Sequence, residues 1–238
     1  MSANKARDTR MPSAQDTARD NPMRPPADSP RTAAEALLTF ALHPSALILA
    51  SVSLAGLLWR VRMGPLGWAD AVLAVVLWAV FPFIEWLIHV HMLHFRPRRI
   101  GRFTLDFYLP KTHRRHHADP WNLDWVFVPR HVHGLVLAAM AVSLWLAGEW
   151  RPLLMSAFVV FLLQGLHYEW VHYLSHISWR PRVAYCERRV LAHRWHHFRN
   201  ETLWWGVSRG WADQVLHTAP DARDVARTDT TTDLGIKH

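Results

Sequence analysis

The sequence of 238 residues contains a single cysteine, Cys186, so no disulfide can form within the chain. It has no HExxH motif, which excludes the zinc chemistry that this motif supports. It shows no internal repeat, and its first residues lack the apolar core and small-residue cleavage site of a secretory signal. We therefore expect a chain without a disulfide scaffold or a secretory signal, and the length suits one domain.

Charged side chains are almost absent from four stretches of membrane length. Three uncharged runs of 17 to 23 residues match the about 20 residues that a helix needs to cross a ~30 Å hydrocarbon core. A fourth stretch carries only Asp70 near its start and Glu85 near its end. The sequence predicts an all-α integral membrane protein with four transmembrane helices, at about residues 37–59, 65–88, 131–148 and 152–174.

Both ends of the chain are polar. Residues 1–36 are rich in Ser, Thr, Pro, Arg and Asp and have no periodic apolar positions, so they cannot bury enough apolar surface to offset the cost of ordering. We predict a disordered N-terminal tail there, a membrane domain over 37–218 and a flexible C-terminal tail over 219–238.

Positive charge is distributed unequally between the segments that flank the spans. The N-terminal tail, residues 94–130 and residues 177–238 together carry 24 Lys and Arg, whereas the other side of the membrane carries three. By the positive-inside rule, both termini and a helical cap around the middle segment are expected in the cytoplasm. This orientation explains the net charge of +8 without a nucleic-acid partner, and we predict none.

Twelve of the 17 histidines lie in four short clusters, all on the side predicted to be cytoplasmic. Two clusters are HxxHH motifs, the third contains HxxxH, and the fourth contains HxxxxH. The clusters comprise His89, His91 and His94; His113, His116 and His117; His167, His172 and His176; and His193, His196 and His197.

The spacing within the clusters suits metal binding. Residues at i, i+3 and i+4 share one face of a helix, so each HxxHH motif presents three imidazoles together. His89 and His94 are five residues apart, so they converge only if their helix ends or distorts there. Neutral imidazole is a common ligand of iron, zinc, copper and nickel. Ten histidines exceed the ligands that one ion uses, so we predict a cap that holds two metals.

Seven histidines are set apart from these ten. His91 and His167 lie within the clusters but off the main spacing, and they are possible additional site residues. The remaining five are interpreted as polar surface residues. These are His43, His131, His133, His217 and His238.

The order HxxxxH, HxxHH, HxxxH, HxxHH resembles the fatty acid hydroxylase/sterol desaturase superfamily of membrane di-iron enzymes. The segment AHRWHHFRNETLWWGVSRGWADQVLHT is similar to the C-terminal box of its bacterial fatty acid hydroxylase-like members, and HYEWVHYLSHISWRPR is similar to their third box. The resemblance covers about residues 80–218 and is much less specific for the substrate than for the superfamily.

The resemblance implies a metal site, a reaction and a source of electrons. It implies O2-dependent hydroxylation or desaturation of an unactivated C–H bond of a lipid by two irons, with zinc possible in an expressed sample. Because the chain has no fused haem or flavin domain, electrons are expected from a separate donor of the ferredoxin, rubredoxin or cytochrome b5 type. The implied ligands are His89, His94, His113, His116, His117, His172, His176, His193, His196 and His197.

Carboxylates near the clusters are candidates to accept the second N–H of a ligating imidazole. Glu85 and Glu169 precede ligand histidines by four and three residues, and a carboxylate near the membrane is costly unless paired. The full candidate set is Glu85, Asp119, Glu169, Glu201 and Asp213, of which Asp119 and Asp213 are equally suited to capping helices or turns.

The sequence leaves two alternatives to acyl-chain hydroxylation open. One is a hydroxylase or desaturase of a sterol or carotenoid ring. The other is a membrane metal transporter, which the position of the histidines at span ends disfavours, since transporters place ligands near the bilayer midplane. We expect a substrate that enters from the bilayer and, for a bacterial source, a location in the inner membrane.

Overall fold

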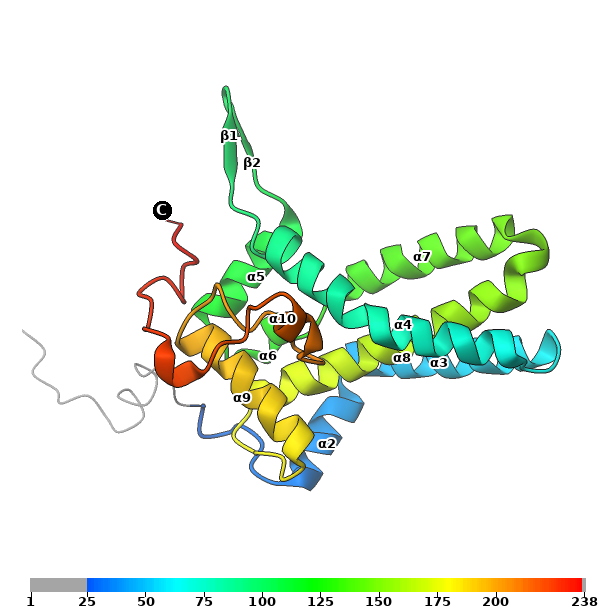
Figure 1. Cartoon of the computed structure of the whole chain (residues 1–238), viewed down its shortest axis with the longest axis horizontal. Helices are drawn as coiled ribbons and strands as arrows, with labels where there is room; N and C mark the ends of the chain where they lie inside the picture. The colour runs from blue at the N-terminus through cyan, green and yellow to red at the C-terminus, as the bar shows by residue number, and fades with distance from the viewer. Residues whose placement is uncertain (1–24, 237–238) are drawn as a thin grey trace, which may run out of the picture.

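The computed structural model describes residues 25–236. The predictions of disorder for residues 1–24 and of a surface position for His238 therefore lie outside the described residues. The chain is mostly helical, and four long helices run side by side away from a cap of shorter elements (Figure 1). These are α3 (Pro44–Arg62), α4 (Trp68–Leu87), α7 (Arg130–Leu146) and α8 (Arg151–Ser175). Taken together with the short helices that adjoin three of them, they form four segments long and apolar enough to cross a membrane, Pro44–Arg62, Trp68–Leu93, Leu123–Leu146 and Gly148–Ser175, which confirms the predicted helical membrane fold with four spans.

The first span begins later than the sequence predicts. Helix α2 (Ala33–Leu42) ends at His43, and α3 starts anew at Pro44. Proline is tolerated in the first turn of a helix but not in its interior, and the His43 ring accepts a hydrogen bond from Ser45 N at 3.3 Å. No charged residue marks this break, so the prediction from uncharged runs treats the two helices as one span.

Helix α2 also contradicts the predicted extent of the N-terminal tail. Its first turn has a capping box, in which Thr32 Oγ1 accepts from Glu35 N and the Glu35 carboxylate accepts from Thr32 N. Just before it, Pro30 O accepts a hydrogen bond from Trp179 N at 2.8 Å. The ordered chain therefore begins before residue 37 and packs on the segment that follows α8.

A π-helix, η1 (Ile88–Leu93), continues α4 into the cap. His94 N donates to His89 O at 3.1 Å, a five-residue hydrogen bond in place of the usual four. This wider turn is the helix distortion that the HxxxxH spacing requires, and it brings the rings of His89 and His94 to a centroid distance of 5.1 Å.

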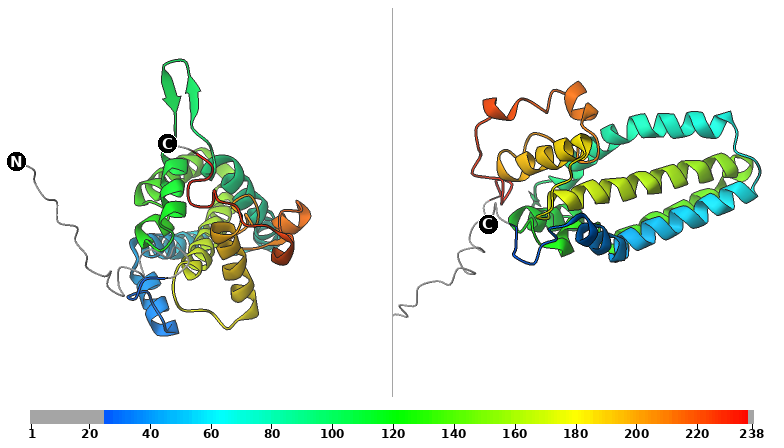
Figure 2. Two further views of the ribbon diagram at one scale, coloured as in Figure 1. Left: turned by 90° about the vertical axis from the view of Figure 1, so that its left-hand side faces the viewer. Right: turned by 90° about the horizontal axis from the view of Figure 1, so that it is seen from below.

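The cap is assembled at one end of the bundle from short elements (Figures 1 and 2). A hairpin of β1 (Arg98–Ile100) and β2 (Phe103–Leu105) projects from it, with Arg99 paired to Thr104. The other cap elements are α5 (Tyr108–Ala118), α6 (Leu123–Val126), α9 (Ala184–Phe198), α10 (Trp211–Val215) and η3 (Ala222–Asp224); η2 (Gly148–Trp150) lies at the opposite end, before α8.

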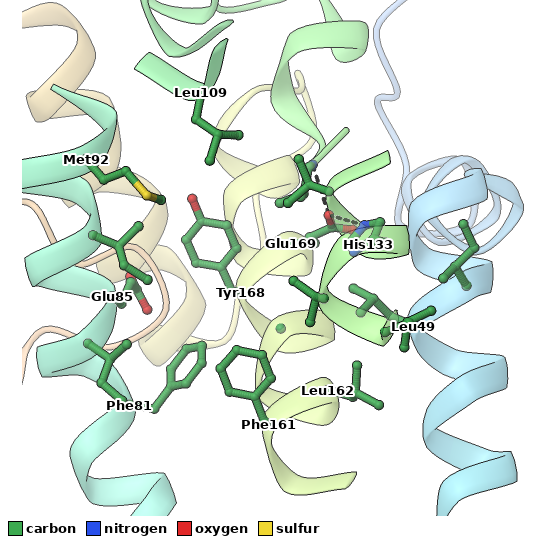
Figure 3. A pocket seen from close by; sticks show the side chains of 18 of the residues that line it. Leu49, Phe81, Glu85, Met92, Leu109, His133, Phe161, Leu162, Tyr168 and Glu169 are labelled. Carbon is green, nitrogen blue, oxygen red and sulfur yellow. Dashed lines mark hydrogen bonds and ion pairs between the residues drawn. The ribbon is translucent and has the colours of Figure 1, made fainter. Parts of the chain in front are cut away.

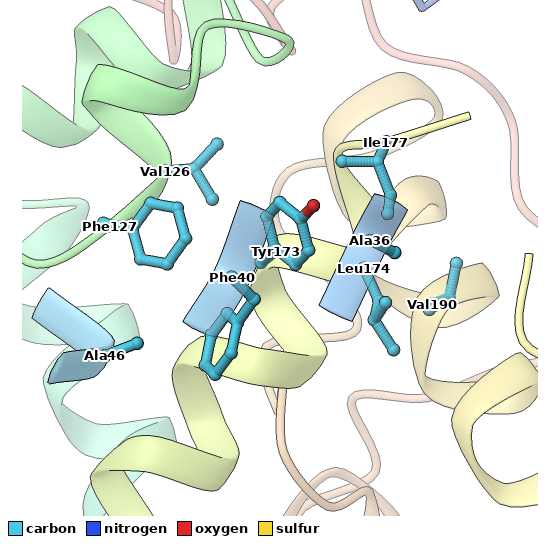
Figure 4. Packing of buried hydrophobic residues seen from close by; sticks show 9 residues of the cluster. All are labelled: Ala36, Phe40, Ala46, Val126, Phe127, Tyr173, Leu174, Ile177 and Val190. Carbon is cyan, nitrogen blue, oxygen red and sulfur yellow. The ribbon is translucent and has the colours of Figure 1, made fainter. Parts of the chain in front are cut away.

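An apolar core joins the cap to the bundle (Figure 4). Phe40 of α2 packs against Phe127 and Tyr173, with ring centroids 5.9 and 5.7 Å apart. Tyr173 is fully buried in α8, one residue after His172. The core therefore fixes the helix that presents the third histidine cluster.

At the other end of the bundle, the one charge near the start of α4 is paired. Asp70 accepts hydrogen bonds from Arg60 Nη2 at 2.7 Å and from Ser156 Oγ at 2.5 Å. A charged group in an apolar setting is costly without such partners. This contact links α3, α4 and α8.

The predicted flexible C-terminal tail is packed against the cap over its described part. Residues 219–236, called here the C-terminal strap, cross the cap end of the molecule (Figure 2). Thr228 Oγ1 donates to Glu201 at 2.5 Å, Thr228 N donates to Arg199 O at 2.9 Å, and Leu234 is buried. Few apolar residues, among them Ala222 and Leu234, are buried in this polar segment, so its composition predicts a flexible tail.

Candidate metal centre

The cap brings all ten predicted histidines together in two groups of five. Within each group, one ring nitrogen of every histidine lies within 4.8 Å of the others. The first group is His89, His94, His113, His117 and His196. The second group is His116, His172, His176, His193 and His197.

Each HxxHH motif supplies both groups. On α5, His113 and His117 belong to the first group and His116 to the second. On α9 the division is reversed, with His193 and His197 in the second group and His196 in the first. Residues four apart lie on nearly the same line of a helix, whereas the residue between them is rotated toward the neighbouring group. His89 of η1 and His94 at its C-cap complete the first group, and His172 of α8 and His176 at its C-cap complete the second.

The ring nitrogens in each group approach one another as ligands of a common ion would. His113 Nε2 lies 3.2 Å from the Nε2 atoms of both His89 and His117. In the second group, the Nε2 atoms of His116 and His172 are 3.1 Å apart, as are those of His176 and His193. The buried Nε2 atoms of His94, His196 and His197 have no hydrogen-bond partner. Buried polar atoms are normally satisfied, so these residues fit bound metal ions.

Backbone carbonyls orient three imidazoles of the first group. His89 donates its Nδ1–H to Trp205 O at 2.6 Å. His117 donates likewise to Thr231 O at 2.9 Å, and His196 to Leu203 O at 2.8 Å. A hydrogen bond at one ring nitrogen fixes the tautomer and leaves the lone pair on the other. Nε2 is therefore the nitrogen that these histidines present to a metal.

The electrostatic environment keeps the imidazoles uncharged. Burial lowers the pKa of His113 and His197 well below the usual range, and neighbouring histidines lower it further. The pKa of His117 is lowered to about 3 by burial, although its hydrogen bond to Thr231 O opposes this shift. Neutral imidazole with a free lone pair is the form that binds metal, so the site is ready to bind at neutral pH.

No carboxylate among the described residues belongs to either group, and none of the five candidate carboxylates is hydrogen-bonded to a ligand histidine. The interpretation of Glu85 and Glu169 as direct partners of these imidazoles is therefore wrong. Glu85 accepts from Val207 N, from Ser208 N at 2.8 Å and from Ser208 Oγ. Glu169 accepts from Val128 N at 3.0 Å.

Of the other candidate carboxylates, Asp213 and Glu201 act one step away from the histidines, and Asp119 does not. Asp213 accepts from Trp205 N at 3.0 Å and Gly206 N at 2.7 Å, which holds the loop whose carbonyl binds His89. A Cβ at Gly206 would lie 2.8 Å from Asp213 Oδ2, so this close approach requires glycine. Glu201 anchors the C-terminal strap, and Asp119 is exposed at the end of α5.

The two additional candidates lie outside both groups. His91 is exposed, with its ring centroid 6.1 Å from that of Trp86. His167 Nε2 lies 3.4 Å from the hydroxyl of Tyr185. Neither belongs to a group of potential ligands among the described residues, so the structure does not support a ligand role for them.

His133 is wrongly interpreted as a surface residue. It is buried at the start of α7, where its Nε2 lies 2.5 Å from Ser45 Oγ and 3.6 Å from Glu169 Oε1. The surface interpretation holds for His131 and His217, which are exposed, whereas His43 is half-buried and stacks on Phe127. A lone histidine carries no sequence signal that separates these environments.

An apolar cavity of about 290 Å³ lies between α3, α4, α7 and α8 (Figure 3). Phe81 and Phe161 lie at one end, and Met92 and Leu109 lie at the other, with Tyr168 between them. His89 lines the cavity and belongs to the first histidine group. The cavity therefore extends from the first group into the membrane-spanning bundle. Sequence analysis missed Tyr168 and the rest of this lining, because apolar residues in a span look alike whichever way they face.

Comparison with known proteins places this arrangement in a family. The sequence profile described as fatty acid hydroxylase matches residues 74–218, more than half of the chain. The chain belongs to the fatty acid hydroxylase family, and it is a multi-pass membrane oxidoreductase of the lipid hydroxylase class.

A solved structure described as full-length Scs7p, with only the hydroxylase domain visible, has a similar fold. The TM-score is 0.61 at 18% sequence identity, and the match covers 90% of this chain and 82% of the other. No curated protein matches the chain. At this identity the solved structure supports the fold alone.

Proposed function

We propose that this chain is an O2-dependent di-iron monooxygenase that hydroxylates a C–H bond of a fatty acyl chain. The observation that carries this proposal is the pair of five-histidine groups, the first of which shares His89 with the apolar cavity. The overall reaction is R–H + O2 + 2 e⁻ + 2 H⁺ → R–OH + H2O. A lipid hydroxylase needs both a redox-active metal site and an apolar substrate site, and here the two adjoin.

Iron is the metal that suits this chemistry. An all-imidazole set binds either iron or zinc, but zinc has no redox chemistry. Two bound irons would supply the binding and reductive cleavage of O2. The protein's own residues fix the ligand geometry through Trp205 O, Leu203 O and Thr231 O, and the apolar cavity walls exclude water.

The cavity favours an acyl chain as substrate. Aliphatic and aromatic side chains make up most of its walls, and a chain laid along it would extend from Phe81 and Phe161 toward His89. Burial of each CH2 group contributes about 0.8 kcal/mol, so such walls bind a chain without polar anchors. We propose that the lipid enters from the bilayer on the cap side.

The remaining parts of the proposal concern partners and location. The two electrons come from a separate donor of the ferredoxin, rubredoxin or cytochrome b5 type. We propose that the cap and both termini lie in the cytoplasm, in keeping with the charge distribution, and that for a bacterial source the protein lies in the inner membrane.

Metal analysis of the purified protein tests the di-iron centre. We expect close to two irons per chain after expression in iron-rich medium, and a Mössbauer spectrum of nitrogen-ligated, high-spin iron. Replacing His172 or His113 by alanine, one from each group, should lower the iron content, while the exposed His131→Ala control should keep both ions. A wild-type protein that binds no metal, or binds it equally well after both substitutions, would contradict the proposal.

A further inference from the structure

The C-terminal strap is anchored at the end of α9, directly after the last HxxHH motif. The Glu201 carboxylate accepts one hydrogen bond from Thr228 Oγ1 at 2.5 Å and another from Thr230 Oγ1. Arg199 Nε donates to Val225 O at 2.8 Å. Glu201 is 4% exposed, so these hydroxyl groups satisfy a carboxylate that would otherwise be buried without partners.

The far end of the strap turns back against the segment that follows η1. Leu234 and Gly235 both have positive φ, 54° and 67°, and Leu234 is 3% exposed. A Cβ at Gly235 would lie 3.2 Å from Arg96 Nη2. The strap is thus fixed on both sides of Thr231. Thr228 and Thr230, which precede it, are hydrogen-bonded to Glu201, and the turn at Leu234 and Gly235 follows it.

Thr231 is the point at which the strap meets the metal centre. Its carbonyl accepts the Nδ1–H of His117 at 2.9 Å, and His117 is 1% exposed. Without this carbonyl, Nδ1–H would be buried without an acceptor, and the ring would lose the bond that fixes its tautomer and orientation.

The two histidine groups depend on the strap unequally. In the first group, three imidazoles are held by carbonyls from outside the helices, and His94 is only partly buried. In the second group, all five histidines are buried, and none is hydrogen-bonded to the strap. Loss of the strap should therefore loosen the first group and spare the second.

We propose that the C-terminal strap completes the first metal site, so that the strap and the metal of that site stabilise each other. The proposal rests on the di-metal centre described above and adds a positioning element, since the family match ends at residue 218, before the strap. Coupling between two bound elements is reciprocal: if the strap strengthens metal binding, the metal must hold the strap in place to the same degree.

Metal retention in strap variants tests one side of this coupling. The full chain, a chain ending at Ala226, and a Thr228→Val/Thr230→Val double variant are loaded with Fe²⁺ without oxygen and titrated with a chelator. Both variants should release one of two irons at ~10–100-fold lower chelator concentration, the range typical of lost ligand-orienting bonds. The second iron should stay within ~2-fold of the full chain.

Two controls separate this effect from general damage. Thr228→Ser/Thr230→Ser keeps both hydroxyl groups and should restore tight binding, and Thr232→Val alters an exposed threonine of the same segment and should change nothing. If the truncated chain retained both irons as the full chain does, or lost both equally, the role of the strap would be overturned. Neither result would contradict a di-metal centre in the full chain. A full chain that binds no iron would overturn both.

Limited proteolysis tests the reciprocal side. Arg223 and Arg227 are exposed, so trypsin can cut the strap whenever it detaches. We expect Fe²⁺ loading to slow these cuts ~10-fold or more in the full chain, and to have less effect in the Thr228→Val/Thr230→Val variant. Cleavage rates that are the same with and without metal in the full chain would contradict the coupling.

Discussion

His172→Ala should abolish hydroxylation while leaving the protein folded and inserted in the membrane. His172 is buried in the second group, and its Nε2 lies 3.1 Å from that of His116. Removing an outer partner of a metal ligand costs ~10–100-fold, so loss of a ligand itself should cost more, at least ~10³-fold in turnover. Turnover is measured as hydroxylated lipid formed per enzyme, with the amount of membrane-inserted protein determined in parallel.

The matched control is His91→Ala. His91 is a histidine from the first cluster that is exposed and lies outside both groups. It should retain close to full activity. Full activity of His172→Ala would rule out a role for the second group in catalysis, and equal loss in both variants would mean that the assay reports damage rather than ligand removal.

Gly165→Phe should block long acyl chains and shift the products toward shorter ones. Gly165 of α8 lines the cavity, and a Cβ there would lie 3.9 Å from Leu49, in ordinary contact. Because Gly165 lines the cavity, a phenyl ring added there should fill space that the chain would occupy. Each displaced CH2 loses about 0.8 kcal/mol of burial free energy, and four of them correspond to a loss of ~200-fold in kcat/KM.

Gly134→Phe serves as the control for this substitution. Gly134 is also a helical glycine, but it is exposed on α7, and no atom lies within 4 Å of a Cβ added there. Its chain-length profile should match that of the wild type, as determined by mass spectrometry of products from a mixture of acyl chains. An unchanged profile in Gly165→Phe would show that the acyl chain binds elsewhere.

The membrane-spanning helices were predictable because the thickness of the bilayer sets the length of an apolar segment, and such segments are visible in the sequence. A span needs about 20 predominantly apolar residues, and all four spans meet this rule. The start of the first span was not predictable by the same rule, because the break at His43 and Pro44 depends on backbone geometry rather than on charge.

The ten histidines that gather in the cap were recognisable from their spacing, but their division into two groups was not. Three histidines on one face of a helix are recognisable in sequence, whereas a rotation of one residue decides which group each one joins. His116 and His117 are adjacent in the sequence and belong to different groups. The convergence of His89 and His94 further depends on a π-helix, for which the sequence offered only the five-residue spacing.

The orienting partners of the ligands were predicted least well. Proximity in sequence suggested Glu85 and Glu169, but the acceptors are backbone carbonyls of Leu203, Trp205 and Thr231. Every residue has a backbone carbonyl, so the residue type does not indicate which carbonyl accepts a hydrogen bond from a histidine. Glu85 instead binds Val207 N and Ser208 N, next to the loop that carries Trp205, whereas Glu169 binds Val128 N; these contacts appear only when distant segments are seen together.

Isotope labelling of the product tests the central claim most directly. Cells that express the protein are grown under ¹⁸O2, and their lipids are compared by mass spectrometry with those of cells that express His172→Ala. The account predicts an acyl chain that gains one labelled oxygen atom only with the wild-type protein. A wild-type lipid profile identical to that of the variant, or an added oxygen that comes from water, would contradict it.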